Sequence, residues 1–110
     1  MTKDIWIMAD QKDLAVTAHT DFLATDLATE QGYPVTWRIF AVFGTAGKLH
    51  LIRKTGVYTA SEILNGDTNL SASVAYTFDV PVENDELINL QTDTGLTVMT
   101  LKVIEMRAQV

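Results

Sequence analysis

The chain has 110 residues, no cysteine, 47% hydrophobic residues and a formal net charge of −6. This length suits one compact domain, and the hydrophobic content argues against disorder. The lack of cysteine excludes disulfides, thiolate nucleophiles and thiolate metal sites. The eight Lys and Arg residues are scattered, which argues against nucleic-acid binding because phosphate contacts need clustered cations.

The N-terminal sequence holds a short apolar run, Ile5–Ala9, between Asp4 and Asp10. It is shorter than the apolar core of a signal peptide, and no segment approaches the roughly 18 apolar residues of a membrane span. We therefore expect synthesis in the cytoplasm without conventional export, and no membrane partner. Residues 1–9 form either a first strand or an N-terminal arm. Trp6 either closes one end of the core or packs on a neighbouring subunit.

Apolar and polar residues alternate in several later runs, most clearly from Val35 to the C-terminus. A period of two indicates strands with one buried and one solvent-facing side. Gly, Asn and Asp between the runs are typical of turns, so the pattern predicts a single all-β domain, a sandwich or a barrel. The expected strands are Leu14–Ala18, Val35–Phe43, Lys48–Lys54, Val57–Leu64, Tyr76–Val82, Leu87–Gln91 and Leu96–Met106.

Two segments are harder to assign. In Asp21–Thr29 the apolar spacing is nearly helical, but the threonine content favours loop and short strand. Leu70–Ala75 is a linker or a short strand. Pro81 cannot donate a backbone hydrogen bond, which indicates a sheet edge or a bulge at that position.

Val35–Phe43 carries apolar residues on both of its faces. Trp37, Ile39, Ala41 and Phe43 share one face, and Phe40 and Val42 lie on the other. Such a strand is expected to be central or covered on both sides. Because this is more apolar surface than one pair of sheets needs, the sequence predicts self-association.

Reactive residues form no recognisable constellation. Neither His19 nor His50 has a neighbouring ligand at metal spacing, and His50 alternates with leucines as a solvent-facing strand residue would. Glu83, Asp85 and Glu86 lack the regular spacing of a calcium loop and are interpreted as a hairpin turn. The serines lack the glycine context of a nucleophile elbow. We therefore predict no catalytic, cofactor or metal site.

Aromatic residues leave a second hypothesis open, a carbohydrate-binding or host-adhesion module of a head or tail fibre. Core packing is the default for an aromatic residue inside an apolar strand pattern, whereas one beside Pro or Gly could be exposed and stack on a sugar. The residues concerned are Trp6, Tyr33, Trp37, Tyr58 and Tyr76. A small hydrolase is a third hypothesis and would require acids converging in a cleft.

Three stretches between Pro34 and Met106 carry a family resemblance, whereas residues 1–33 carry little of it. They read WRIFAVFGTAGKLHLIRKTG, SEILNGDTNLSASVAYTFDVPV and DELINLQTDTGLTVMTLKVIEM. Together they resemble a family of small β-structured proteins of tailed phages and tailed archaeal viruses, which are capsid decoration (cement) or other virion-surface proteins. The stretch VPVENDELINLQTDTG is also similar to trimeric jelly-roll domains of the complement and tumour-necrosis-factor type.

These resemblances imply a β-sandwich of jelly-roll type that associates around a threefold axis. They imply a non-enzymatic virion structural protein, most specifically a homotrimeric decoration protein on the capsid surface, with the major capsid protein as its partner and no catalytic residues or cofactor. On this view the N-terminal segment is the expected contact with the capsid or a neighbouring subunit. Its contact residues are Ile5, Trp6, Ile7 and Met8.

Overall fold

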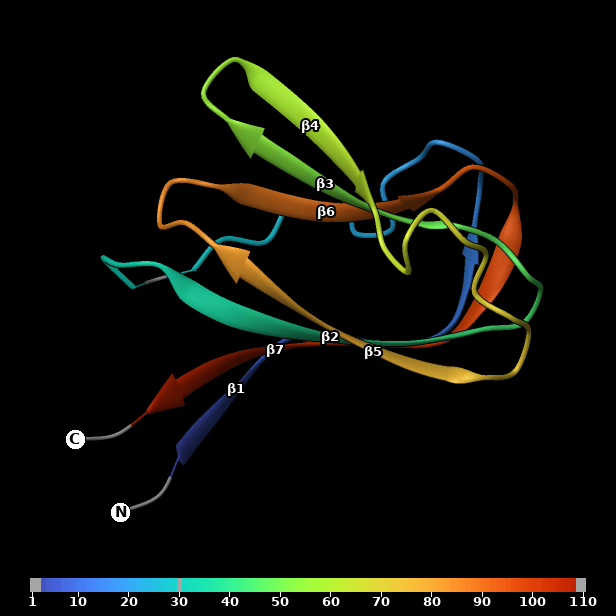
Figure 1. Ribbon diagram of the computed structural model, residues 1–110, viewed down its shortest axis with the longest axis horizontal. Coiled ribbons are helices and arrows are strands. Elements are labelled where there is room, and N and C mark those ends of the chain that lie inside the picture. Colours follow the sequence, from blue (N-terminus) through green and yellow to red (C-terminus); the bar gives the residue numbers. More distant parts are fainter. Residues whose placement is uncertain (1–2, 30, 109–110) are drawn as a thin grey trace.

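The structure, a computed structural model, describes residues 3–29 and 31–108 and is all-β, as predicted. Its seven strands form two antiparallel sheets (Figure 1). Sheet A has the strand order β1-β7-β2-β5 and sheet B has the order β4-β3-β6. The strands are β1 (Lys3–Val16), β2 (Val35–Phe43), β3 (Leu49–Thr55), β4 (Tyr58–Ile63), β5 (Ala75–Val82), β6 (Leu87–Thr92) and β7 (Leu96–Ala108).

The core lies between the two sheets. The inward residues of β2, from Trp37 to Phe43, are fully buried, and Leu49 and Leu51 of β3 face them from sheet B. Strand β2 lies between β7 and β5, which confirms that it is a central strand. Strand β5, which contains Pro81, is an edge strand, as the proline predicts.

One acid is buried within this core. Glu105 of β7 is fully buried, and its Oε1 accepts a hydrogen bond of 2.9 Å from the indole Nε1 of Trp37 on the neighbouring strand. Hydrogen-bond donors such as this indole offset the loss of water that burial imposes on a carboxyl group. The sequence analysis did not anticipate this pair.

Strand β1 differs from the prediction. The sequence suggests a separate N-terminal segment and a strand at Leu14–Ala18, but one strand runs from Lys3 to Val16 through the polar residues between them. It pairs with β7 along its whole length, with a bulge between Ile7 and Ala9 and a positive φ of 51° at Asp13. The long partner strand supplies the hydrogen bonds that hold this polar stretch extended.

Residues 17–29 form a loop with a short bridge and cover the free edge of β6. The prediction of a loop with a short strand is confirmed for Asp21–Thr29, whereas the predicted strand Leu14–Ala18 ends at Val16. His19 N donates to Thr92 O (2.7 Å) and Phe22 N donates to Leu90 O (2.8 Å). Leu27 and Ile88 exchange two backbone bonds of 2.8 Å each. The buried side chains of Phe22 and Leu23 anchor the segment in the core.

The β3–β4 hairpin projects away from sheet A (Figure 1). Gly56 opens its two-residue loop with a φ of +58°, as the first position of a type II′ turn requires. At the tip, Val57 is 93% exposed and Tyr58 is 78% exposed. The hairpin is held by the Arg53 guanidinium, which binds Glu62 of β4, Pro81 O of β5 (2.7 Å) and Glu86 (2.9 Å). Arg53 therefore links the two sheets.

Candidate interaction surface

The predicted contact residues lie in the first half of β1 and point in different directions. Trp6 is 46% exposed and pairs with Glu105, which places it on the side of sheet A that faces sheet B. Ile7 is 56% exposed and pairs with Ile104 on the opposite, outer side. Met8 lies at the bulge, half-buried against the core. For Ile5 the structure gives the backbone pairing with Met106.

Of the two alternatives for residues 1–9, a first strand or an N-terminal arm, the structure shows a strand for residues 3–9, because β7 is long enough to pair with them in the same sheet. Residues 1–2 of that expected arm lie outside the described residues. The assignment of this region to a partner contact remains a prediction.

The outer side of sheet A gathers further apolar residues around Ile7. The register places Ile104 beside both Ile7 and Arg38, and it places Met106 two positions further along β7. Phe40 and Val42 continue the surface along β2, where the register places the charged Lys102 of β7 beside Phe40. Phe40, Val42, Ile104 and Met106 are partly buried, whereas Ile7 is exposed. We call this set, which no strand or loop of the described chain covers, the outer face. It consists of Ile7, Phe40, Val42, Ile104 and Met106.

An ion pair lies in the middle of the outer face. Arg38 Nε and Nη2 contact Asp79 Oδ1 and Oδ2 at 2.8 and 3.0 Å, and both side chains are half-exposed. The hydrogen bond between them lowers the pKa of Asp79 and raises the pKa of Arg38. Because the two charges are already paired in the bidentate geometry, covering them is less unfavourable than covering separate charges.

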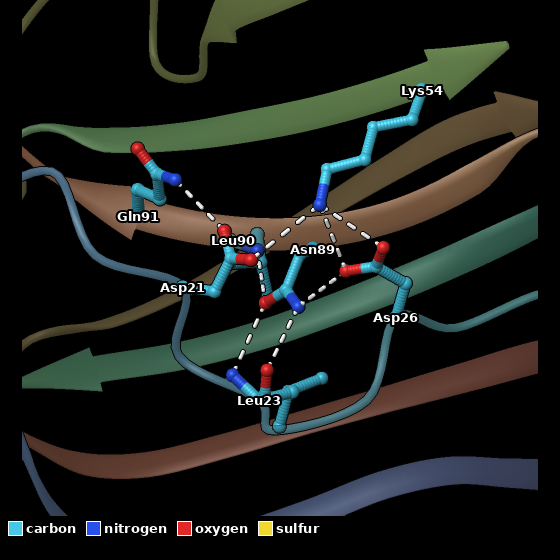
Figure 2. A network of polar contacts seen from close by, with 7 residues as sticks. All are labelled: Asp21, Leu23, Asp26, Lys54, Asn89, Leu90 and Gln91. Carbon is cyan, nitrogen blue, oxygen red and sulfur yellow. Dashed lines mark hydrogen bonds and ion pairs between the residues drawn. The ribbon is translucent and has the colours of Figure 1, made fainter. Parts of the chain in front are cut away.

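A polar network on the outer side of sheet B fixes residues 21–26 (Figure 2). The amide of Asn89, which is buried, accepts from Leu23 N (3.1 Å) and Leu90 N (2.8 Å) and donates to Leu23 O (2.9 Å) and Asp26 (2.8 Å). Lys54 Nζ contacts Asp26 at 3.0 Å. These bonds satisfy buried backbone groups, so the network serves the fold and not a ligand.

This network makes stability depend on pH. The hydrogen bond from Asn89, followed by the effect of Lys54, holds the pKa of Asp26 below its usual 3.8. A lowered pKa means that the carboxylate stabilises the fold above about pH 4 and that this contribution is lost as the pH falls through the folded-state pKa. We expect the difference in unfolding free energy between the wild type and Asp26→Asn to shrink from pH 6 to pH 3 in urea titrations. A constant difference would contradict this prediction.

A serine, a histidine and an aspartate lie together at the base of the hairpin. His50 Nδ1 is 3.1 Å from Ser61 Oγ, and His50 Nε2 is 3.5 Å from Asp93 Oδ1. In a serine-hydrolase triad Nε2 faces the serine and Nδ1 the acid, so the ring is reversed here. Ser61 also lies within a regular exposed strand and not on a nucleophile turn. We interpret the trio as a cross-link between β3 and β4 through His50 and Ser61, because His50 Nε2 approaches Asp93 but forms no hydrogen bond.

The aromatic residues of the carbohydrate hypothesis are distributed over several elements. Trp37 is fully buried in the core, and Tyr58 lies at the tip of the β3–β4 hairpin. Tyr76 stacks on Phe78 of the same strand, with ring centroids 6.2 Å apart, and its hydroxyl accepts a hydrogen bond from Ser71 N. The burial of Trp37 confirms core packing, the default expected for it, and removes it from the carbohydrate hypothesis.

The fold and surface define an all-β, two-sheet domain with an uncovered, partly apolar sheet face. Comparisons with protein-family models, with characterised proteins and with solved structures find no match. In the part of the chain that the structure describes, no three His, Asp or Glu side chains are arranged to hold a metal ion. That part also lacks any helix with the length and hydrophobicity needed to cross a membrane.

Proposed function

We propose that this protein is a non-enzymatic virion structural protein, a homotrimeric decoration protein that binds the outer surface of a capsid and stabilises the shell. The observation that carries the proposal is the outer face. The core between the sheets is filled without it, yet Ile7, Phe40 and Ile104 present apolar surface around the Arg38–Asp79 pair and Lys102. Such a surface is typical of protein–protein contact. The resemblance of residues 34–106 to virion-surface proteins supports a capsid as the place where this contact is made.

We further infer a jelly-roll topology, in which pairs of strands are nested around a central hairpin and form two Greek keys. The pairing supports this inference. β1 pairs with β7, β2 pairs with β5, and β3 pairs with β4. Residues 17–29 pair with β6 by bridges, and they occupy the place of the eighth strand. Counted in this way, the pairs are nested in chain order, from β1 with β7 on the outside to β3 with β4 at the centre.

The trimer follows from how such a chain would act on a capsid. Three copies around an axis match the local threefold points where neighbouring capsid subunits meet. A protein that binds the assembled shell and not its separate subunits stabilises the shell by mass action. The outer face would join the copies to one another, and the partner contact predicted for Ile5–Met8 shares Ile7 with it.

Self-association can be tested in solution. Multi-angle light scattering at micromolar concentration should give a mass near three chains for the wild type. Phe40→Glu replaces the aromatic side chain beside Lys102 by a carboxylate. It should reduce the mass to one chain, because an ion pair buried in an interface is less stable than apolar side chains of similar volume by about 1–4 kcal/mol. Leu87→Glu, on the exposed outer side of sheet B, is the matched control and should leave the trimer intact. Equal masses for both variants would contradict the role of the outer face.

A further inference from the structure

The free strand edges of the two sheets differ in their protection. The edge of β6 is covered by residues 17–29, which leaves β1, β5 and β4 as edges in the described chain. An uncovered edge can pair with another chain, and proteins block such pairing with bulges, prolines and charged residues. The presence or absence of these features therefore indicates which edges are protected from pairing with another chain.

Two of the three edges carry such devices. Strand β1 has a bulge between Ile7 and Ala9, with charged residues following from Asp10. Strand β5 contains Pro81, which lacks an N–H group. Both edges are poorly suited to pairing along their length.

Strand β4 carries none of these devices. Its register with β3 has no irregularity, and it contains no proline. The consecutive residues Thr59, Ala60 and Ser61 are exposed and uncharged. Its one charged residue, Glu62, is bound to Arg53. In a chain with a net charge of −6, this is a regular, electrically neutral edge.

The pairing of β4 with β3 determines which backbone N–H and C=O groups of β4 point outward. Leu64 N donates to Leu49 O at 2.9 Å. In an antiparallel pair, hydrogen-bonded positions alternate, so the register makes Ala60 and Glu62 the residues that bond to β3. The N–H and C=O groups of Thr59, Ser61 and Ile63 then point away from the sheet, at the spacing that an added strand would match.

From this geometry we infer that the β4 edge accepts an extended, uncharged segment of a partner polypeptide by strand addition, the partner being the capsid protein. The partner's identity rests on the proposed function. The edge itself selects for an extended backbone, because its recognition groups are alternating donors and acceptors. Alternate side chains of the added strand would lie over Tyr58 and Ala60, so apolar residues at every second position fit best.

Binding to empty shells assembled from the capsid protein of the same genome tests this inference. Thr59→Pro removes one outward N–H group and leaves the bonds to β3 in place, and it should weaken co-sedimentation with the shells about tenfold. Thr59→Ala keeps the N–H group and should bind like the wild type. Ala60→Lys keeps all backbone donors but adds a charge to the edge, and it should weaken binding similarly. Hydrogen exchange should slow in residues 57–64 on the shell.

The outcomes separate the two proposals. Equal binding of the wild type, Thr59→Pro and Ala60→Lys, with unchanged exchange in residues 57–64, would overturn the strand-addition site and leave the decoration function standing. Failure of every form, the wild type included, to bind the shells would overturn the decoration function and the partner named here. Slow exchange in residues 57–64 of the chain alone, at high concentration, would show that a second copy occupies the edge, and it would overturn the assignment to the capsid protein.

Discussion

Replacing Trp37 by phenylalanine should lower the free energy of unfolding by about 3 kcal/mol. The substitution removes the indole N–H that bonds to Glu105 at 2.9 Å and leaves a fully buried carboxyl group without this donor. It also leaves a small void beside β7. Urea unfolding followed by fluorescence or circular dichroism measures the change.

A double-mutant cycle with Glu105→Gln separates the hydrogen bond from the packing. Trp37→Phe should cost less in the Glu105→Gln background, because a neutral amide depends less on the indole N–H than a carboxylate does. Ile39→Val, at the next inward position of β2, is a packing control that should cost about 1 kcal/mol. If Trp37→Phe costs the same in both backgrounds, the buried pair does not contribute as we describe.

Asn89→Ala should also destabilise the protein strongly, by about 3 kcal/mol, because it leaves the buried N–H and C=O groups of Leu23 without their partners. The loss should be local at first. Residues 17–29 should detach from β6, so the amides of Phe22 and Leu27 should exchange faster than those of the core strands.

Gln91→Ala is the matched control for this network. Gln91 donates one hydrogen bond of 2.8 Å to Asp21 in a partly exposed position, so its removal should cost less than about 1 kcal/mol. Similar effects of the two substitutions, or unchanged exchange of residues 17–29 in Asn89→Ala, would contradict the role of Asn89 as the fastening of this segment.

The strands could be predicted from the sequence wherever the alternation is regular. Strand β2 begins and ends at the predicted residues, Val35 and Phe43, because turn residues flank a clean pattern of period two. The sequence does not predict that β1 is one continuous strand, since the polar run between Asp10 and Asp13 interrupts the alternation of apolar and polar residues. Only the pairing with β7 keeps this run extended. Local strand propensity takes no account of pairing with a segment that is distant in the sequence.

The candidate surface was partly visible in the sequence. The apolar second face of β2 and the exposed Ile7 were anticipated, whereas Ile104 and Met106 join them only through the register of β7 with its neighbours. Glu105 shares the inward positions of Leu101 and Val103, but a charged residue in such a pattern usually indicates solvent. Its burial depends on Trp37, 68 residues away in the chain.

The decoration function is tested most directly by electron cryomicroscopy of empty capsid shells incubated with the purified chain. We predict added density on the outer surface, with three copies of the two-sheet domain around each local threefold point, joined through their outer faces. The Phe40→Glu variant should give weaker density. Shells that show no added density at saturating concentrations of a folded wild-type chain would contradict the account.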